Sequence, residues 1–363
     1  MSKLAVVLLA AGQGTRMNSK TQKILHEVGG KPMVMHVFEA AESVADRRPV
    51  LVVGPGKAGV QTLIGQRADY VVQAEQMGTG HAAMMAEAVL RGQTEQVIVA
   101  YGDMPLLRDQ TLAHLSQTQA RSGAAVVMLS VVGDPASSFG RVVRDDHGRV
   151  REIVEVAEAK QRADTAVLLA INELNVGVYC FAADWLWQNI HNLPLRQARS
   201  GQEYYLTDMI GMAIEQGQLV EAISIDDPDE SLGAGTRAEM VAVEKAFRRR
   251  ANRRWLENGV TLVDPDTTYI DPDVTIGQDT VIWPNTYVQG RTTIGADCVI
   301  GPNAILRQAQ VGDNCRIEQA VVENAAIPDN TKVQPFTIIN GQQLTANSQQ
   351  PTANSFWLLA SDE

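Results

Sequence analysis

The first half of the chain alternates short apolar runs with amphipathic stretches. The runs are rich in β-branched residues and have the length of buried strands; they cover residues 5–9, 50–53, 70–73, 97–101 and 125–132. Between several of them, apolar residues recur at helical spacing, as in residues 33–45 and 81–90. This alternation predicts an α/β domain with a Rossmann-like, mostly parallel, doubly wound sheet. Such sheets bind ligands at the carboxyl ends of their strands.

The apolar pattern changes its period in the second half of the chain. Apolar residues recur there at six-residue spacing, at Ile270, Ile276, Ile282, Val288, Ile294, Ile300 and Leu306. After a slip of one residue, the pattern continues at Val311, Ile317, Ile327, Val333 and Ile339. A sixfold period fits neither a helix nor a plain strand and indicates a hexapeptide-repeat, left-handed parallel β-helix. At roughly three hexads per coil, we expect about four coils.

These two patterns divide the chain into four predicted parts. The parts are a first domain (residues 1–235), a connecting helix (236–259), a β-helix (260–341) and a polar tail (342–363). The connecting helix is predicted because Thr236 and Glu239 fit a capping box, and apolar residues follow at helical spacing. The tail contains the apolar sequence FWLL, whose role the sequence does not define.

Composition and charge limit the cellular compartments and the classes of partner that the sequence favours. The three cysteines are an odd, scattered set, which favours neither a disulfide framework nor a zinc site and is typical of a reducing cytoplasm. No apolar run reaches the length of a membrane span, and the N-terminal run leads into a glycine turn rather than a signal-peptide cleavage site. The net charge of -11 argues against nucleic-acid binding. We therefore expect a cytoplasmic protein without nucleic-acid or membrane partners.

A glycine turn follows the first predicted strand, in the sequence LLAAGQGTRMNSKTQKIL that begins at Leu8. It is not a good dinucleotide fingerprint, because Met17 replaces the third glycine, and it lacks the Gly-Lys-Ser/Thr of a P-loop. An ordinary tight turn and an anion-binding nest of backbone amides are both open readings. Arg16 and Lys23 favour the second, because these cations suit phosphate groups.

This segment resembles the opening of the sugar-1-phosphate nucleotidyltransferase family, and within it the bacterial N-acetylglucosamine-1-phosphate uridyltransferases. Further segments agree in the same order: QAEQMGTGHA from Gln73, YGDMPLL from Tyr101, FGRVV from Phe139, IVE from Ile153, ELNVGVY from Glu173 and EYYLTD from Glu203. The resemblance covers about residues 3–340. It implies a sheet of the nucleotide-diphospho-sugar transferase type, followed by the β-helix that many members carry.

The resemblance also implies site residues. The nucleotide would be bound by Leu9, Ala10, Ala11, Gly12, Gly14, Gln73, Gly78, Thr79, Tyr101 and Gly102. The sugar would contact Gly140, Glu155 and Asn175. Arg16, Lys23 and Asp103 would be the catalytic residues, with Asp103 holding Mg²⁺ as the cofactor.

The implied reaction is Mg²⁺-dependent, in-line transfer of uridylyl from UTP to N-acetylglucosamine-1-phosphate, which gives UDP-N-acetylglucosamine and pyrophosphate. Two anions must meet, and the attacking phosphate oxygen is already ionised. Catalysis therefore needs positioning and charge neutralisation rather than a general base. Two readings stay open beside it: another sugar-1-phosphate, such as glucose-1-phosphate, or another nucleotide, and a weakly catalytic regulatory subunit that senses nucleotide sugars.

The sequence departs from the family in three places. Gln22 stands where the family has proline, and Gly235 stands where it has an asparagine that binds the metal. Either the metal relies on Asp103, phosphates and water, or a neighbour such as Asp227 or Thr236 substitutes. Many members also transfer an acetyl group with a β-helix histidine, whereas all six histidines here precede the repeat. We expect the acetyltransferase activity to be absent, and the β-helix to assemble a homotrimer as in the family.

Overall fold

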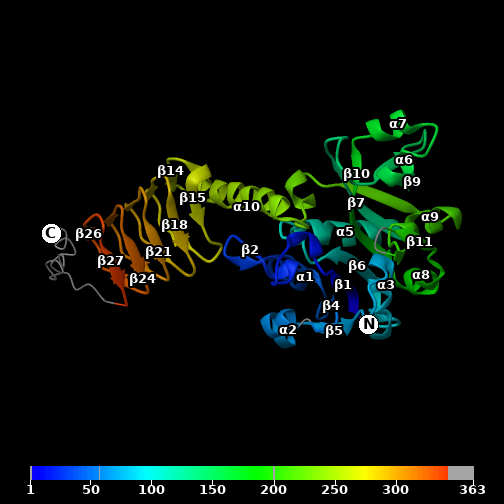
Figure 1. Cartoon of the computed structure of the whole chain (residues 1–363), viewed down its shortest axis with the longest axis horizontal. Coiled ribbons are helices and arrows are strands. Elements are labelled where there is room, and N and C mark those ends of the chain that lie inside the picture. The colour runs from blue at the N-terminus through cyan, green and yellow to red at the C-terminus, as the bar shows by residue number, and fades with distance from the viewer. Residues whose placement is uncertain (1, 57, 199–200, 342–363) are drawn as a thin grey trace, which may run out of the picture. The chain divides into compact units, whose positions relative to one another are not determined.

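The computed structural model describes residues 2–56, 58–198 and 201–341 (Figure 1). The chain forms two compact units, Met1–Glu244 and Lys245–Glu363. The boundary between them falls within helix α10 (Arg237–Glu257), in the segment predicted as a connecting helix. The predicted polar tail, residues 342–363 with its FWLL sequence, lies outside the described residues. Within the described residues, no helix combines the length and apolar character needed to cross a bilayer.

A mixed, mostly parallel sheet forms the centre of the first unit. Its main strands run in the order β13-β7-β10-β6-β1-β4-β5, and β8 and β9 extend it beside β10. Their bounds are β1 Ser2–Ala10, β4 Val50–Val53, β5 Asp69–Val72, β6 Thr94–Tyr101, β7 Val126–Val132, β8 Arg141–Arg144, β9 Val150–Val154, β10 Glu173–Ala182 and β13 Val220–Ser224. Strand β10 is antiparallel to β6 and β7, whereas β1, β4, β5 and β6 are parallel. The predicted fold class is confirmed.

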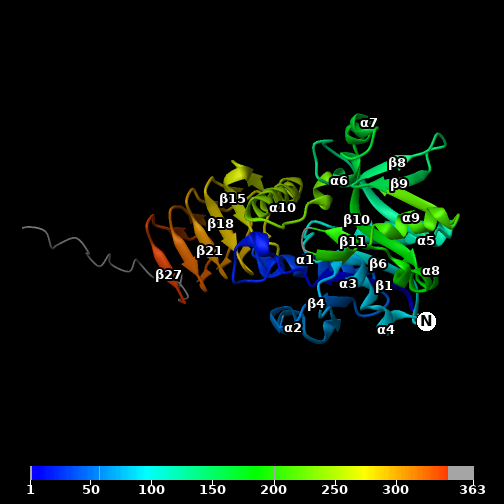
Figure 2. The ribbon, with the colours of Figure 1, turned by 45° about the vertical axis from the view of Figure 1, so that its right-hand side comes forward.

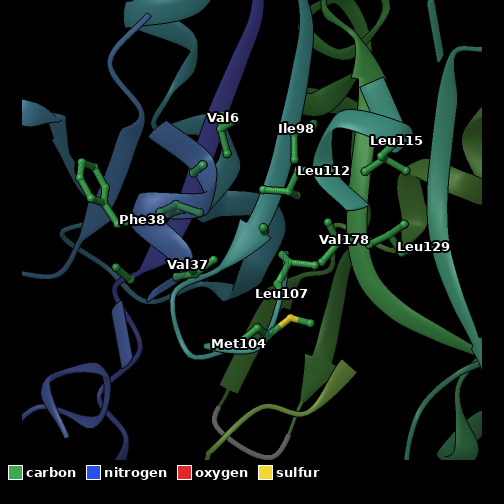
Figure 3. Close-up of a cluster of buried hydrophobic side chains, with 14 of the residues drawn as sticks. Val6, Val37, Phe38, Ile98, Met104, Leu107, Leu112, Leu115, Leu129 and Val178 are labelled. Atoms are coloured by element: carbon green, nitrogen blue, oxygen red, sulfur yellow. The ribbon is translucent and has the colours of Figure 1, made fainter. Parts of the chain in front are cut away.

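Helices cover both faces of this sheet, which explains why its strands are apolar throughout. Successive residues of β1 point to opposite faces, so Val6 joins one buried cluster and Val7 the other. Figure 3 shows the first cluster, in which Phe38 of α1 (Met33–Val44) and Leu112 of α5 (Asp109–Ser122) lie beside the strands. The second cluster is covered by α3 (Gly78–Met84), α4 (Glu87–Leu90), α8 (Ala183–Asn189) and α9 (Asp208–Glu215).

The remaining elements of the first unit are short. They are β2 Glu27–Val28, β3 Lys31–Pro32, α2 Ala58–Ile64, α6 Val156–Ala159, α7 Thr165–Ala170, β11 Leu195–Ala198, β12 Gly201–Tyr204 and the 3-10 turns η1 Thr15–Met17, η2 Lys23–Leu25, η3 Gly65–Arg67, η4 Ile190–Asn192 and η5 Pro228–Ser231. One prediction was wrong in this unit: residues 81–90 do not form a single helix. The N–H groups of Met85 and Ala86 bond three residues back, not four, which separates α3 from α4.

The second unit is a parallel β-helix (Figure 2), as the sixfold period predicted. Its three sheets are β14-β17-β20-β23-β26, β15-β18-β21-β24-β27 and β16-β19-β22-β25. The strands are β14 Thr261–Leu262, β15 Thr268–Ile270, β16 Thr275–Ile276, β17 Val281–Ile282, β18 Thr286–Gln289, β19 Thr293–Ile294, β20 Val299–Ile300, β21 Ile305–Arg307, β22 Gln310–Val311, β23 Arg316–Ile317, β24 Val321–Glu323, β25 Ala326–Ile327, β26 Lys332–Val333 and β27 Ile338–Asn340; the 3-10 turn η6 (Pro265–Thr267) precedes β15.

The apolar residues of the repeat form the β-helix core. All twelve that the sequence singled out belong to one cluster, and only Ile276 is less than fully buried. Val322 is buried beside them, but a five-residue step from Ile317 hid it from a strict count of six. Two sheets have five strands and the third has four, where about four coils were expected; β14, in the first of these sheets, precedes the first hexad. Several corners are turned by Asn or Asp at positive φ, such as Asn303, because these residues tolerate that conformation.

Candidate active site

The predicted site residues gather where parallel strands of the first unit end. Strands β1 and β6 are neighbours in register, with Leu9 opposite Tyr101. The N–H of Gly102 donates to the carbonyl of Leu9 at 3.0 Å, which joins the two strand ends directly. Residues that follow β1 and β6 therefore share one edge of the sheet, the edge where such folds bind ligands.

The glycine turn after β1 is shaped by Gly14. This residue has a left-handed φ of 64° and precedes η1, and its carbonyl accepts the N–H of Met17 at 2.9 Å. Met17 is buried, whereas Arg16 is exposed on the same short turn. A Cβ atom at position 14 would lie 2.5 Å from the Cβ of Lys23. Only glycine therefore allows this turn to pack against Lys23.

Lys23 and Asp103 meet at this edge. The Lys23 ammonium donates to the carboxylate of Asp103, which follows β6, and both side chains are mostly buried. The structure thus brings together two of the three residues expected to be catalytic. The third, Arg16, lies against the main chain of Gly235.

The residues expected to bind the base are engaged with the main chain. Gln73 is buried, and its side-chain amide donates to the carbonyl of Gly78 at 3.0 Å. The hydroxyl of Thr79 accepts the N–H of Leu206 at 3.0 Å. Sequence reasoning gave no role to Gln76, whose side chain donates to the carbonyl of Ala11. Gln76 lies in the motif that starts at Gln73, and its place in that motif was the only indication in the sequence that it belongs to the site.

The three residues expected to contact the sugar also come together. The N–H of Asn175 donates to the carbonyl of Gly140 at 2.8 Å, and the carboxylate of Glu155 lies against Gly140. Glu155 keeps part of its surface exposed, but the surrounding protein still partly desolvates its carboxylate and raises its pKa; Glu158 and Asp208 raise it further.

Asn175 belongs to a buried polar group on the strand β10. Its side-chain amide donates to the Tyr179 hydroxyl at 2.9 Å, and its Oδ1 accepts the N–H of Gly177 at 3.1 Å. The pairing of β10 with β7 shifts register between Asn175 and Tyr179. A bulge of this kind changes the direction of the side chains along the strand. The ring of Tyr101 lies against Gly177, which is within the bulge. Burial raises the pKa of Tyr101, so its phenol stays neutral.

Arg141 is a residue that sequence reasoning missed. It is buried, and its guanidinium donates to the carbonyls of Pro135, Ser137 and Phe139. These bonds hold the loop that leads into Gly140. The motif FGRVV contained Arg141, but its spacing alone did not show that the side chain turns back on its own loop.

Asp103 is the principal metal ligand that the resemblance implies. The described residues contain no group of three or more His, Cys, Asp or Glu suited to a metal ion. The suggested substitutes have other partners: Asp227 pairs with Arg108, and the Thr236 hydroxyl accepts the N–H of Glu239 at 3.2 Å. Mg²⁺ often keeps several waters and binds through one or two carboxylates plus phosphates. Asp103 therefore fits such an ion, whereas position 235 supplies no ligand atom.

Comparison with known proteins agrees with both parts of the fold. Residues 6–201 match the family described as MobA-like NTP transferase domain. Residues 273–308 match six repeats of the family described as bacterial transferase hexapeptide. The first match covers more than half of the chain and contains the strand ends, the glycine turn and the sugar-side loop described above.

Three relatives align with this chain over nearly its whole length. The bifunctional protein GlmU of Exiguobacterium sp. (strain ATCC BAA-1283 / AT1b) is 42% identical over 350 residues, which is 96% of this chain and 76% of the relative. The bifunctional protein GlmU of Exiguobacterium sibiricum is 40% identical over 344 residues, 94% of this chain and 75% of the relative. That of Halalkalibacterium halodurans is 40% identical over 340 residues, 93% of this chain and 73% of the relative.

Proposed function

Since the chain belongs to the MobA-like NTP transferase family, and within it to the GlmU-like nucleotidyltransferases, we propose that it transfers uridylyl from UTP to N-acetylglucosamine-1-phosphate. The products are UDP-N-acetylglucosamine and pyrophosphate. The proposal rests on the family for the reaction class. The choice of UTP and of this sugar phosphate follows the ordered motifs, from QAEQMGTGHA to EYYLTD, that first pointed to these substrates.

One observation carries the proposal: Lys23, Asp103 and the glycine turn converge at the carboxyl ends of β1 and β6. A phosphate oxygen attacking another phosphate must overcome charge repulsion, and it needs no proton removed. Lys23 and Arg16 supply positive charge for the triphosphate and the attacking phosphate. The amides of the turn approach the nucleotide phosphates. The site therefore works by holding two anions close and in line.

Asp103 would hold the magnesium ion that this chemistry uses. When bound, the ion adds positive charge beside the phosphate oxygens and the departing pyrophosphate. Lys23 now neutralises the Asp103 carboxylate, so the same side chain keeps that acid compatible with a site built for anions. Lys23 would turn toward the phosphates once they arrive, since a lysine ammonium on its flexible stem is free to change partners.

The residues proposed to contact the substrates form two groups at the carboxyl edge of the sheet, one for the nucleotide and one for the sugar. We assign the nucleotide to the strand ends and to the loop after β5; its contacts are Leu9, Ala10, Ala11, Gly12, Gly14, Gln73, Gly78, Thr79, Tyr101 and Gly102. We assign the sugar to Gly140, Glu155 and Asn175, which the hydrogen bond between Asn175 and Gly140 holds together. Tyr101 lies between the two groups, because its phenol bonds to Thr79 and its ring contacts Gly177.

A pyrophosphate-release assay over a panel of nucleotides and sugar phosphates tests this function. We expect the highest kcat/KM with UTP and N-acetylglucosamine-1-phosphate and dependence on Mg²⁺. A preference for glucose-1-phosphate or for another nucleotide would move the protein to a different member of the same reaction class. Nucleotide-sugar binding without pyrophosphate release from any pair would instead indicate a regulatory subunit.

We further propose that the chain does not acetylate glucosamine-1-phosphate, although its relatives are named bifunctional. Amine attack on a thioester needs a base, and residues 260–341 contain no histidine. Their arginines stay protonated and do not serve as the base. The test is thiol release from acetyl-CoA. Release that requires the sugar, and that is lost on mutation within residues 260–341, would overturn this proposal.

The proposed assembly is a homotrimer formed through the β-helix, in the cytoplasm. The outward positions of the sheet that contains β15 and β18 form an apolar row, which we call the outer ladder: Tyr269, Tyr287, Ile305, Val321 and Ile338. The rings of Tyr269 and Tyr287 stack with centroids 4.6 Å apart. A continuous apolar row on the outside of a solenoid suits association with further copies of the chain. The three free cysteines agree with a reducing compartment.

A further inference from the structure

Gly235 lies directly against the guanidinium of Arg16. A Cβ atom at position 235 would be 2.5 Å from the Nη2 atom of Arg16 and 3.2 Å from its Cζ. Such distances are shorter than van der Waals contact, so any side chain at this position displaces the guanidinium. Gly235 does not have a positive φ, so an alanine there meets no backbone strain. Glycine at position 235 therefore matters because it leaves space for the Arg16 guanidinium, and not because of its backbone conformation.

The segment around Gly235 is fixed by the start of α10. The N–H of Gly235 donates to the carboxylate of Glu239 at 2.7 Å, and the Thr236 hydroxyl accepts the N–H of Glu239 at 3.2 Å. This is the capping box expected at Thr236, with the Glu239 carboxylate bonded one residue earlier than usual. The segment is thus held on its helix side without any help from Arg16.

The other end of the segment is tied to Asp103. The N–H of Ala234 donates to the Asp103 carbonyl at 3.2 Å, and Gly233 lies beside the same residue. A single stretch, residues 233–235, therefore borders both Asp103 and Arg16. Since Asp103 pairs with Lys23, this stretch connects all three proposed catalytic residues.

We propose that residues 233–235 are a positioning element for the reaction, and that glycine at 235 sets where the Arg16 guanidinium lies. The inference rests on the proposed function and adds a positioning residue to it. Position 235 offers two exclusive arrangements: a side chain, or the Arg16 guanidinium in its present place against Gly235. This chain has the second, so the Arg16 cation lies at the position where a side chain with a further ligand atom would stand.

A double-mutant cycle tests this coupling. The variants are Gly235→Ala, Arg16→Ala and the double variant, with Gly211→Ala in α9 as the control, since a Cβ there meets nothing within 4 Å. Two quantities are measured: kcat/KM with UTP, and the Kd for inorganic tripolyphosphate by calorimetry. We expect Gly235→Ala to weaken both by about 10-fold or more, because it displaces one preorganised cation. In the Arg16→Ala background, the same change should have a much smaller effect, because only the Cβ contact at 3.0 Å from the Glu239 carboxylate remains.

The outcomes separate this inference from the proposed function. If no nucleotide pair is turned over but the tripolyphosphate cycle still shows the coupling, the function is wrong and the positioning role stands. If Gly235→Ala and Arg16→Ala act additively in the tripolyphosphate cycle, or if the chain does not bind tripolyphosphate, the positioning role is wrong. Melting temperatures report whether each variant folds. Gly235→Ser is the second variant, and its larger side chain should weaken binding further.

Discussion

The ammonium group of Lys23 forms an ion pair with the carboxylate of Asp103, 80 residues further along the chain. This pair places a cation and an anion where the phosphates of both substrates are expected to meet. We predict that Asp103→Asn lowers kcat by about 10²-fold or more and weakens the dependence on Mg²⁺, because the amide holds a divalent ion poorly. The measurement is pyrophosphate release across a Mg²⁺ titration.

Asp146→Asn is the matched control for Asp103→Asn. Asp146 is an exposed carboxylate in a loop of the same unit, and the change removes the same charge. Its kcat and its Mg²⁺ curve should match those of the wild type. An Asp103→Asn variant with normal turnover and an unchanged Mg²⁺ curve would show that the metal is held elsewhere.

Gly14 controls the position of Lys23, so Gly14→Ala should damage catalysis more than folding. An alanine at a φ of 64° costs about 1 kcal/mol of stability. Its methyl group would also lie 2.5 Å from the Cβ of Lys23, which must move and carry its ammonium away from Asp103. We predict a loss of about 10-fold or more in kcat with a small fall in melting temperature.

Gly148→Ala separates the two effects at Gly14. Gly148 also has a positive φ, 77°, but a Cβ there would meet nothing within 4 Å. The control therefore carries the same backbone strain without a displaced lysine, and it should keep normal turnover. Equal kcat losses in both variants would mean that backbone strain, and not the contact with Lys23, explains the effect.

The sequence predicted the fold well because both halves carry strong periodic signals. The strand at residues 50–53 matched β4 residue for residue, and the sixfold repeat placed the β-helix core. Periodicity does not show interruptions that depend on local geometry. The break at Met85 and Ala86 and the inward position of Val322 were therefore missed.

The site was predictable only as a set of motifs. The glycine turn and the cations that follow it suggested an anion, but nothing in their spacing showed that Lys23 reaches Asp103 across 80 residues. Hydrogen bonds between side chains and main-chain carbonyl groups also could not be predicted from the sequence. Arg141 and Gln76 hold loops through carbonyl groups, and such bonds depend on how the chain turns in three dimensions. The position of Arg16 against Gly235 could not be predicted from the sequence for the same reason.

His36 should make folding stability depend on pH. It lies in α1, and its Nε2 is 2.8 Å from the carbonyl of Val28. Burial lowers its pKa, and Lys31 lowers it further, while the Val28 carbonyl and Glu39 oppose the shift. Below its ordinary pKa, the unfolded chain therefore binds a proton that the folded chain resists. Stability is fully present above about pH 6.5 and falls as the pH drops through the lowered pKa.

The measurement is the melting temperature of the wild type and of His36→Gln between about pH 7.5 and 5. The wild type should lose more stability over this interval, since glutamine does not titrate. His147→Gln, which removes an exposed histidine in a loop of the same unit, is the control. Parallel curves for wild type and His36→Gln would assign the acid sensitivity to other groups, such as His26, whose pKa burial also lowers.

The outer ladder should be the surface through which copies of the chain associate. Tyr287 lies in its middle rows, is exposed, and stacks on Tyr269, so a lysine there would place a charge within an apolar contact. We predict that Tyr287→Lys converts the proposed trimer to monomers at micromolar concentration, measured by sedimentation. Thr293→Lys is the control, because Thr293 points outward from a different sheet of the same β-helix. A trimer that survives Tyr287→Lys and dissociates with Thr293→Lys would assign the interface to the other sheet, and a monomeric wild type would exclude a stable trimer.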